Sequence, residues 1–348
     1  EHETMNLFKY LSLLIFLTII SSLITDFVRR FSIKNKLFDI PNDRSSHDIP
    51  KPKGGGISIV LIILGTVIAL SFFEMIKPDI SMSMITGLSI IAVVGFIDDY
   101  KNLPILLRTV SYFVAAVFSI YLIGGITSIS ISDYYFDLNH IGFFLGVLFL
   151  VWITNLYNFM DGIDGFAAVQ TVCVSLFCGW LFYLSGETSY AIIMLCLIAS
   201  TIGFLYWNWA PAKIFMGDVG SCTIGFLFGL LSLYMEKAGI ISIAVWLILL
   251  SPFIGDSTFT LFKRIICKEK WYTAHNEHAY QKLHQLGLTH AKLATGLLVI
   301  NIIVIWPIAW LAHAYKNVEF LMLMSSYSII AIIWLVVQSK CKETKTIL

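Results

Sequence analysis

The feature that most restricts the fold of this chain is a series of apolar stretches, each close to 20 residues long. A helix of about 20 apolar residues crosses the hydrocarbon core of a bilayer. The 348-residue sequence is 58% hydrophobic and only 13% charged, which excludes an ordinary soluble domain. We predict eleven spans, near residues 6–28, 56–73, 83–97, 105–122, 140–155, 165–184, 190–207, 219–235, 240–262, 292–312 and 318–338. The expected fold class is therefore an all-α polytopic integral membrane protein.

The chain is expected to form one domain. Residues 1–4 precede Met5, and we interpret them as residues added during cloning, so that 5–348 is a single transmembrane domain. None of the six cysteines forms a Cys-x-x-Cys pair, so the sequence predicts neither a disulfide framework nor a zinc site.

The distribution of basic residues predicts the orientation. An alternating topology places the loops 29–55, 98–104, 156–164, 208–218, 263–291 and 339–348 on one side. With two marginal residues, that side holds 19 of the 23 lysines and arginines. Because cytoplasmic loops carry the excess of positive charge, we expect the N-terminus outside and the C-terminus in the cytoplasm.

A polar connector, residues 208–221, reads Asn-Trp-Ala-Pro-Ala-Lys-Ile-Phe-Met-Gly-Asp-Val-Gly-Ser. Pro211 ends the preceding helix, and Asp218 lies where the next helix begins. Free amides at that helix start favour an anion such as phosphate. A carboxylate at the same place can hold a metal that bridges to the phosphate. Taken alone, the connector is equally compatible with a plain loop and a capping Asp.

The first loop of the predicted cytoplasmic side, residues 38–56, is basic, contains several prolines and ends in three glycines. Arg44, His47, Lys51 and Lys53 form a predicted cationic patch. Ordinary topological charge explains any single lysine equally well, but it requires neither the histidine nor the glycines. The loop as a whole indicates anion binding.

Two further loops are acidic. Asp98 and Asp99 are adjacent at the end of the third span, where mutual repulsion can produce a proton acceptor. A solvated acidic helix end is the alternative. After the fifth span come Asn158, Asp161 and Asp164, and the two aspartates share a face if the segment is helical. Carboxylates and amides without sulfur or histidine suit a hard ion, most plausibly Mg²⁺.

The ninth span contains Pro252, Gly255 and Asp256, a pattern that predicts a broken helix with its carboxyl group facing protein or a cavity. The loop that follows contains His275 and His278, which we expect to contact a diphosphate rather than zinc. With eleven spans, all five motif loops lie on the cytoplasmic face. They imply a phosphate-bearing substrate, a divalent metal, a lipid partner and no nucleic acid.

The five loops together resemble those of the polyprenyl-phosphate N-acetylhexosamine-1-phosphate transferases, the MraY/WecA-like family of glycosyltransferases (family 4). The resemblance covers nearly the whole chain. Its specific marks are Asp98-Asp99, Asn158-x-x-Asp161-x-x-Asp164-Gly165, Asn208-x-x-Pro211-Ala212 and Phe215-Met-Gly-Asp218. The resemblance implies a single transferase domain that moves a sugar-1-phosphate from a UDP-sugar to undecaprenyl phosphate and releases UMP.

The resemblance also implies roles for individual residues. It makes Asp218 a catalytic Mg²⁺ ligand, with Mn²⁺ as a substitute, and Phe215 the ring that stacks on uracil. It makes Asp98 the base that deprotonates the lipid phosphate, although Asp99 is not excluded. The implied nucleotide-sugar contacts are Asn158, Asp161, Gly162, Asp164, Asn208, Phe215, His275 and His278. For the phosphates of donor and lipid, the expected contacts are the cationic residues of the first loop, Arg44, His47, Lys51 and Lys53.

Arg44-Ser-Ser-His47 and His275-Asn-Glu-His278-Ala-Tyr-Gln-Lys resemble the branch that initiates O-antigen synthesis, represented by WbpL and WecA. That branch implies a sugar of the GlcNAc, QuiNAc or FucNAc type and a location in the bacterial inner membrane. The alternatives are a phospho-MurNAc-pentapeptide transferase of peptidoglycan synthesis, a membrane transporter that uses Asp256, and a structural scaffold. The sequence leaves open the sugar, the choice between direct attack and a two-step reaction, and whether the protein is a homodimer.

Overall fold

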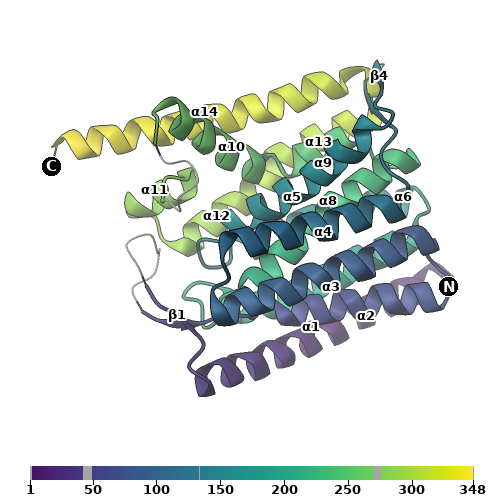
Figure 1. Cartoon of the computed structure of the whole chain (residues 1–348), viewed down its shortest axis with the longest axis horizontal. Coiled ribbons are helices and arrows are strands. Elements are labelled where there is room, and N and C mark those ends of the chain that lie inside the picture. Colours follow the sequence, from purple (N-terminus) through teal and green to yellow (C-terminus); the bar gives the residue numbers. More distant parts are fainter. Residues whose placement is uncertain (1, 42–48, 133, 270–275, 348) are drawn as a thin grey trace.

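The protein is a bundle of long helices, seen in a computed structural model that describes residues 2–41, 49–132, 134–269 and 276–347. The long helices run side by side along one direction (Figure 1). In chain order they are α1 His2–Lys34, α2 Ile57–Phe72, α3 Pro78–Lys101, α4 Ile105–Leu122, α5 Ile141–Phe159, α6 Phe166–Leu184, α7 Thr188–Asn208 and α8 Asp218–Ala238. There follow α9 Ile243–Leu249, α10 Ser251–Ile266, α11 Ala279–Gln285, α12 His290–Ile300, α13 Trp306–Ala314 and α14 Glu319–Ile347.

Two short helical segments and four short strands complete the fold. A π-helical segment, Asn301–Ile305, joins α12 to α13, and a 3₁₀ turn, Lys316–Val318, precedes α14. Strand β1 (Phe38–Asp39) pairs antiparallel with β2 (Lys51–Pro52). Strand β3 (Ser128–Ile131) pairs antiparallel with β4 (Tyr134–Asp137). The two strand pairs lie at opposite ends of the bundle (Figure 1).

The helices account for the predicted apolar stretches. Among the described residues, nine helices are long and apolar enough to cross a membrane, and a bent helix pair raises that number to ten. Helix α2, with 16 residues, is a shorter apolar helix. The all-α polytopic class is thus confirmed, whereas eleven spans and their orientation stay predictions. The N-terminal end of α1 and the C-terminal end of α14 lie at opposite ends of the bundle (Figure 1), as an odd number of crossings requires.

The predicted break in the ninth span is present. Helices α9 and α10 meet at Leu250 with a bend of 77°. Pro252 lies in the first turn of α10, where its missing N–H costs no helical hydrogen bond. We had predicted that Gly255 is part of the break as well, and this prediction is wrong. Gly255 lies inside α10, where a Cβ would come within 2.6 Å of Ile330 Cγ2, so its small size permits close packing on α14.

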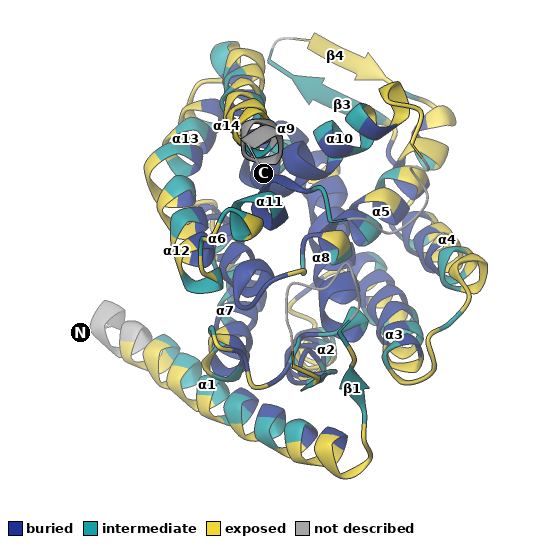
Figure 2. Ribbon diagram, turned by 90° about the vertical axis from the view of Figure 1, so that its left-hand side faces the viewer, coloured by how far each residue is buried: buried dark blue, intermediate teal, exposed yellow. Residues whose placement is uncertain are grey.

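Helix α8 forms the centre of the bundle. Figure 2, a view along the helices, shows α8 dark blue and surrounded by the others. Most of its residues are buried, including Phe226, Phe228 and Leu230. Since α8 begins at Asp218, the polar connector before it is placed at the middle of one end of the bundle. The candidate site lies there.

Candidate active site

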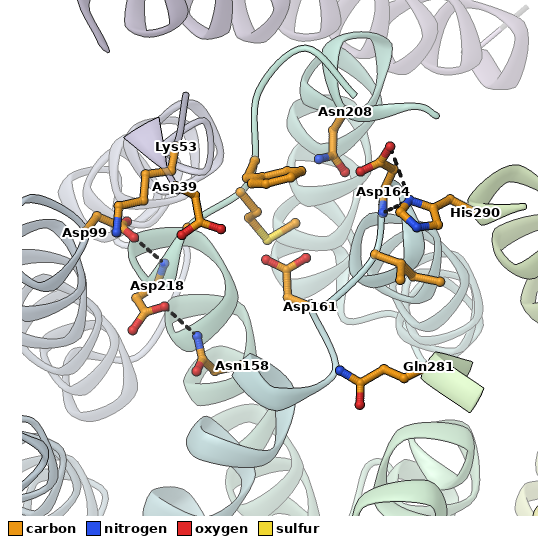
Figure 3. A pocket seen from close by; sticks show the side chains of 15 residues that line it. Asp39, Lys53, Asp99, Asn158, Asp161, Asp164, Asn208, Asp218, Gln281 and His290 are labelled. Atoms are coloured by element: carbon orange, nitrogen blue, oxygen red, sulfur yellow. Dashed lines mark hydrogen bonds and ion pairs between the residues drawn. The ribbon is translucent and has the colours of Figure 1, made fainter. Parts of the chain in front are cut away.

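A cavity of about 260 Å³ opens at the end of the bundle where α8 begins. We call it the acidic cavity, because four aspartates besides Asp218 line it (Figure 3). Its walls come from β1, the loop after β2, the end of α3, the α5–α6 loop, the α7–α8 connector, α11 and α12. The lining residues are Asp39, Lys53, Asp99, Asn158, Asp161, Gly162, Ile163, Asp164, Asn208, Phe215, Met216, Gly217, Asp218, Gln281 and His290. The structure thus brings four of the five predicted motif loops to one place, together with part of the fifth.

The glycine loop after β2 packs against the connector through its backbone. The amides of Gly55 and Gly56 donate to the carbonyls of Phe215 and Met216, each at 2.9 Å. The Phe215 amide donates to the Pro52 carbonyl, also at 2.9 Å. A Cβ on Gly56 would overlap Gly220 at the start of α8. These two glycine amides therefore bind the connector and not a phosphate, which corrects the predicted use of the glycines.

The start of α8 is already occupied by a carboxyl group of the protein. Asp99 accepts hydrogen bonds from the amides of Asp218 and Val219, at 3.0 and 3.2 Å. Gly217 has a φ of +78°, and a Cβ there would overlap the Asp99 carboxylate. We had predicted that these amides bind a substrate phosphate. Instead the side chain of Asp99, from α3, caps α8 by accepting these amide hydrogen bonds at the positive end of the helix dipole.

Two side chains fix the Asp218 carboxylate. The Asn158 amide donates to its Oδ1 at 2.9 Å, and Arg108 Nη1 lies 3.1 Å from its Oδ2. The same Arg108 nitrogen lies 2.9 Å from Asp98 Oδ2, so one guanidinium joins the ends of α3, α4 and α8. Asp98 also accepts from the Leu103 amide and does not line the acidic cavity. Of the paired aspartates, Asp99 borders the cavity and Asp98 holds Arg108.

Asp161 differs from its neighbours because, among the described residues, its carboxylate has no hydrogen-bond partner. The side chain points into the cavity (Figure 3). Burial, and then the negative charges of Asp218, Asp99 and Asp164, raise the pKa of Asp161 well above its ordinary value. The segment after Met160 is not helical, so Asp161 and Asp164 do not share a helical face. An unpaired carboxylate of this kind favours the binding of a cation, which stabilises its ionised form.

Asp164 is surrounded by an amide, a lysine and a histidine, and its own backbone amide donates to His290 Nδ1 at 3.3 Å. Its Oδ2 accepts from the Ala212 amide at 2.9 Å and lies 3.3 Å from both Lys51 Nζ and His290 Nδ1. Burial alone would raise the pKa of Asp164, but the bonds from His290 and Ala212 and the charge of Lys51 hold it below its ordinary value. Its Oδ1 is buried without a partner among the described residues. The cavity therefore contains an acceptor oxygen that a ligand donor can satisfy.

Phe215 lines the cavity, and Lys51, which is not a lining residue, lies beside its ring. Lys51 Nζ lies 5.2 Å from the centre of the Phe215 ring, and the ring is partly exposed. Asn208 serves the loops instead: it accepts from the Gly165 amide and donates to the Ile214 carbonyl, both at 3.0 Å. Gly162 lies under Tyr280, whose hydroxyl would overlap a Cβ there.

His278 does not reach the acidic cavity. It is buried at the start of α11, with Nδ1 3.6 Å from Asp256 Oδ1. Asp256 accepts from the amides of Ala279 and Tyr280, at 2.8 and 3.4 Å, so it caps α11. Its occupation by this cap removes the basis for a transport site at Asp256. Arg44, His47 and His275 lie outside the described residues.

Four residues of the site were not predicted from the sequence: Asp39, Arg108, Gln281 and His290. Asp39 reaches the cavity because β1 pairs with β2 and sets it opposite Lys51. Gln281 lies in the first turn of α11, and His290 is the first residue of α12. His290 Nε2 is buried without a partner among the described residues. The sequence signal for His290 was its position just before the predicted span 292–312. The diphosphate contact was instead predicted at His275 and His278.

The donor set suits a hard divalent cation only in part. Within the described residues, no three His, Cys, Asp or Glu side chains come close enough to enclose a metal ion. Asp161 and Asp218 nevertheless border one cavity, and the Asp161 carboxylate is unpaired among the described residues. Mg²⁺ usually takes one or two carboxylates and completes its shell with water and substrate phosphates. The residues present fit that mode of binding, not a closed protein cage.

The fold and the site together define a multi-pass membrane protein with an acidic, polar cavity at one end of its helices. The sequence model of glycosyl transferase family 4 matches residues 81–236. A probable undecaprenyl-phosphate N-acetylglucosaminyl 1-phosphate transferase of Bacillus subtilis is 32% identical over 292 residues, 81% of this chain and 79% of that protein. A phospho-N-acetylmuramoyl-pentapeptide-transferase of Streptococcus pyogenes is 26% identical over 249 residues, 64% of this chain and 74% of that protein. The chain belongs to glycosyl transferase family 4, as a membrane transferase of the polyprenyl-phosphate type.

Proposed function

We propose that the protein transfers an N-acetylhexosamine-1-phosphate from a UDP-sugar to undecaprenyl phosphate and releases UMP. The observation that carries this proposal is the acidic cavity itself. Asp161 and Asp164 line it, each with an oxygen that is unpaired among the described residues, beside the Phe215 ring and Lys53, and Lys51 lies 5.2 Å from the ring centre. A nucleotide diphosphate sugar needs an aromatic surface, an edge acceptor and positive charge for its phosphates.

The uracil ring of the UDP-sugar would stack on the ring of Phe215. The Oδ1 of Asp164, which has no partner among the described residues, would accept a hydrogen bond from an N–H of the uracil ring. Lys51 lies between the ring and Asp164, at 5.2 Å from the ring centre and 3.3 Å from the carboxylate. Its ammonium group would therefore lie near the first phosphate of a nucleotide stacked on the ring. His290 Nε2 offers a second contact on the same wall.

A divalent cation, Mg²⁺ or in its place Mn²⁺, would bind between Asp161, Asp218 and the diphosphate. When bound, it would neutralise charge that builds up on the diphosphate as the bond to phosphorus breaks. Asn158 and Arg108 keep the Asp218 carboxylate in one orientation, through bonds of 2.9 and 3.1 Å. Such fixed positions are what phosphoryl transfer requires of a protein.

The acceptor oxygen needs little activation. A phosphate monoester loses its second proton near a pH of about 6, so the lipid phosphate is largely a nucleophile at neutral pH. We propose direct attack on the donor, with Asp98 as the base that takes any remaining proton. Asp99, which borders the cavity, is the alternative base.

For the sugar we propose the GlcNAc, QuiNAc or FucNAc type, and for the pathway the start of O-antigen or another cell-surface polysaccharide in the bacterial inner membrane. The greater identity and coverage of the Bacillus subtilis relative support this choice over the pentapeptide transferase. A homodimer is compatible with the proposal and is not required by it.

The test is an assay of the purified protein with Mg²⁺, undecaprenyl phosphate and a panel of UDP-N-acetylhexosamines, followed by UMP release and glycolipid formation. Asp218→Asn is run beside it as the inactive control. We expect one or more donors to give both products, and EDTA to stop the reaction. Activity only with UDP-MurNAc-pentapeptide would replace the proposed branch, and release of UMP by no donor from folded protein would refute the transferase assignment.

A further inference from the structure

Two cations lie against the indole ring of Trp207, where α1 runs along the outside of the bundle next to α7 (Figure 2). Arg29 Cζ lies 4.9 Å from the centre of the indole ring, and Lys213 Nζ lies 5.2 Å from it. Lys213 Nζ is also 6.0 Å from the centre of the Tyr206 ring, which meets Trp207 edge to face. We call Arg29, Arg30, Tyr206, Trp207 and Lys213 the α1–α7 patch. A cation beside an aromatic face is attracted by the ring and keeps N–H donors for an anion.

Bonds between the two helices hold the patch in one arrangement. Trp207 Nε1 donates to the carbonyl oxygen and to the hydroxyl oxygen of Ser22, both at 3.0 Å. A Cβ on Gly203, one turn earlier in α7, would come within 2.4 Å of the Thr18 carbonyl oxygen, so the helices pack closely here. The indole ring is therefore in place before a ligand binds, which lowers the cost of ordering the site.

One carboxylate serves two of the three cations of the patch. Arg29 Nη2 lies 2.7 Å from Asp26 Oδ1, and Arg30 Nη2 lies 2.7 Å from Asp26 Oδ2. The Lys213 ammonium group has neither a hydrogen-bond partner nor an ion-pair partner among the described residues. Three cations beside one carboxylate leave an excess of positive charge on the patch.

The patch lies at the depth where lipid headgroups meet water. It is formed by the last turns of two candidate membrane spans, Phe8–Lys34 and Thr188–Asn208, and by the residues that follow the second span. Tyr206 is 69% exposed, and Trp209 is 41% exposed. Exposed aromatic residues at the end of a span lie at the level of the headgroups. The Arg30 side chain is 75% exposed, so its guanidinium is accessible at the same depth.

We propose that the α1–α7 patch binds the phosphate of an anionic phospholipid of the surrounding bilayer. Lys213 and Arg30 donate hydrogen bonds to the phosphate, and the glycerol and the upper acyl carbons lie against Tyr206 and Trp209. Charge complementarity selects this occupant. A zwitterionic headgroup brings its own ammonium group to a cationic surface, whereas phosphatidylglycerol brings only negative charge. A free phosphate ion would gain nothing from the exposed rings.

The patch adjoins the connector that leads to the acidic cavity. The Lys213 amide donates to the Trp207 carbonyl at 2.8 Å, and Phe215, two residues further along the chain, lines the cavity. A lipid held by Lys213 therefore stabilises the connector at its α7 end. We expect bound anionic lipid to raise the melting temperature of the protein.

Native mass spectrometry measures binding without turnover. The full chain is placed in detergent micelles with equal amounts of phosphatidylglycerol and phosphatidylcholine that have the same acyl chains, and the lipids retained on the folded protein are counted as their concentration rises. We expect phosphatidylglycerol to be retained in preference to phosphatidylcholine and to raise the melting temperature more. Equal retention of the two lipids would overturn the proposal. Because no sugar donor is present, the result is independent of the transfer reaction.

Two substitutions locate the site. Lys213→Gln and Arg30→Gln each remove one charge of the patch, and Lys101→Gln, at an exposed position at the end of α3, is the matched control. One basic residue near the membrane surface changes the affinity for an anionic lipid about fivefold. We expect each patch variant to weaken phosphatidylglycerol retention by about that factor, the double variant to weaken it further, and Lys101→Gln to leave it unchanged.

Thermal unfolding without added lipid checks that the variants are folded. Retention that is unchanged in the folded double variant, or an equal loss in Lys101→Gln, would contradict the assignment.

A photoreactive phosphatidylglycerol, with a diazirine close to the glycerol, tests the contact directly. After irradiation we expect labelled peptides from residues 202–213 of the α7 end and residues 23–30 of α1. Labels confined to other helices would overturn the proposal. Labelling of these peptides that excess undecaprenyl phosphate abolishes and excess phosphatidylglycerol does not would also overturn it, because the patch would then serve the acceptor lipid.

Discussion

Two clusters of acidic residues lie near the two ends of α8, which begins at Asp218 and ends at Ala238, and they differ in which of their oxygens have hydrogen-bond partners. At the end near β3, Glu236 Oε1 accepts from the Ser130 amide and Oε2 from the Ile243 amide, both at 2.7 Å. Glu319 accepts from the Ser132 amide at 2.7 Å and from the Ser242 hydroxyl. We call these two glutamates the hairpin cluster. All four of their oxygens have partners.

The acidic cavity has the same kind of groups in a different state. Asp161 and one oxygen of Asp164 have no partner among the described residues. Burial of carboxylates is therefore common to a structural cluster and a candidate site. The distinguishing property is an oxygen left for a ligand, next to cations that come from distant parts of the chain.

The largest effect that separates the two clusters is on turnover. Asp161→Asn should lower kcat by about 10²–10³-fold, because it removes charge that acts on the reacting diphosphate. It should leave the melting temperature equal or higher, since the carboxylate is unpaired among the described residues. Glu236→Gln should do the opposite, with near-normal kcat and a lower melting temperature. Assays of UMP release and of thermal unfolding on both variants test these opposite expectations. The comparison fails if Glu236→Gln abolishes turnover in stable protein.

A smaller effect concerns the ring of the cavity. Phe215→Ala should raise the donor KM about tenfold or more, because stacking on a base is worth about 1–3 kcal/mol. Phe215→Tyr keeps the ring and serves as the matched control, with a KM close to that of the wild type. Isothermal titration with UDP gives the same comparison without turnover. Equal affinity for UDP in the alanine and tyrosine variants would remove the ring from the nucleotide site.

At the hairpin cluster the expected effect is on stability alone. Glu319→Gln replaces one accepting oxygen by a donor and should reduce the free energy of unfolding by about 1–2 kcal/mol. Glu74→Gln, at an exposed position, is the matched control. Chemical or thermal unfolding in micelles measures the difference. A loss of activity in Glu319→Gln without a loss of stability would show that the hairpin cluster is a functional site.

The smallest effect is a pH dependence at Asp164. The fold lowers the pKa of Asp164, so the ionised carboxylate stabilises the folded protein. This contribution to the free energy of unfolding is fully present above the pKa of an unfolded Asp, about 3.9, and is lost as the pH falls through the lower pKa of the folded state. The difference in unfolding free energy between wild type and Asp164→Asn should be about 1 kcal/mol near neutrality. It should vanish on acidification. Lys51→Met should reduce the difference, and a difference that grows in acid would have the wrong sign.

The sequence predicts local features of this molecule well. Apolar length alone locates the helices, because the bilayer sets their length and backbone bonding. Asp161, Asp164, Phe215 and Asp218 reach one cavity because each follows or precedes a helix end on the same side. The break near Pro252 is also a local property of the chain.

Contacts between distant segments were not predictable. Arg108 was counted only as loop charge, yet it joins Asp98 to Asp218 across more than 100 residues of sequence. Nothing in the local sequence indicates that Asp99, from α3, accepts the amides at the start of α8. His290 and His278 have the same chemistry, and only the packing of α11 on Asp256 decides which one reaches the cavity.

The backbone contact between the glycine loop and the connector has a consequence for the order of events. Lys53 and Phe215 are carried by two segments joined by three hydrogen bonds and by the Gly56–Gly220 contact, with no flexible side chain between them. A ligand that displaced one segment would therefore have to displace the other. Two ligands that each displaced one of these segments would change each other's affinity by the same factor.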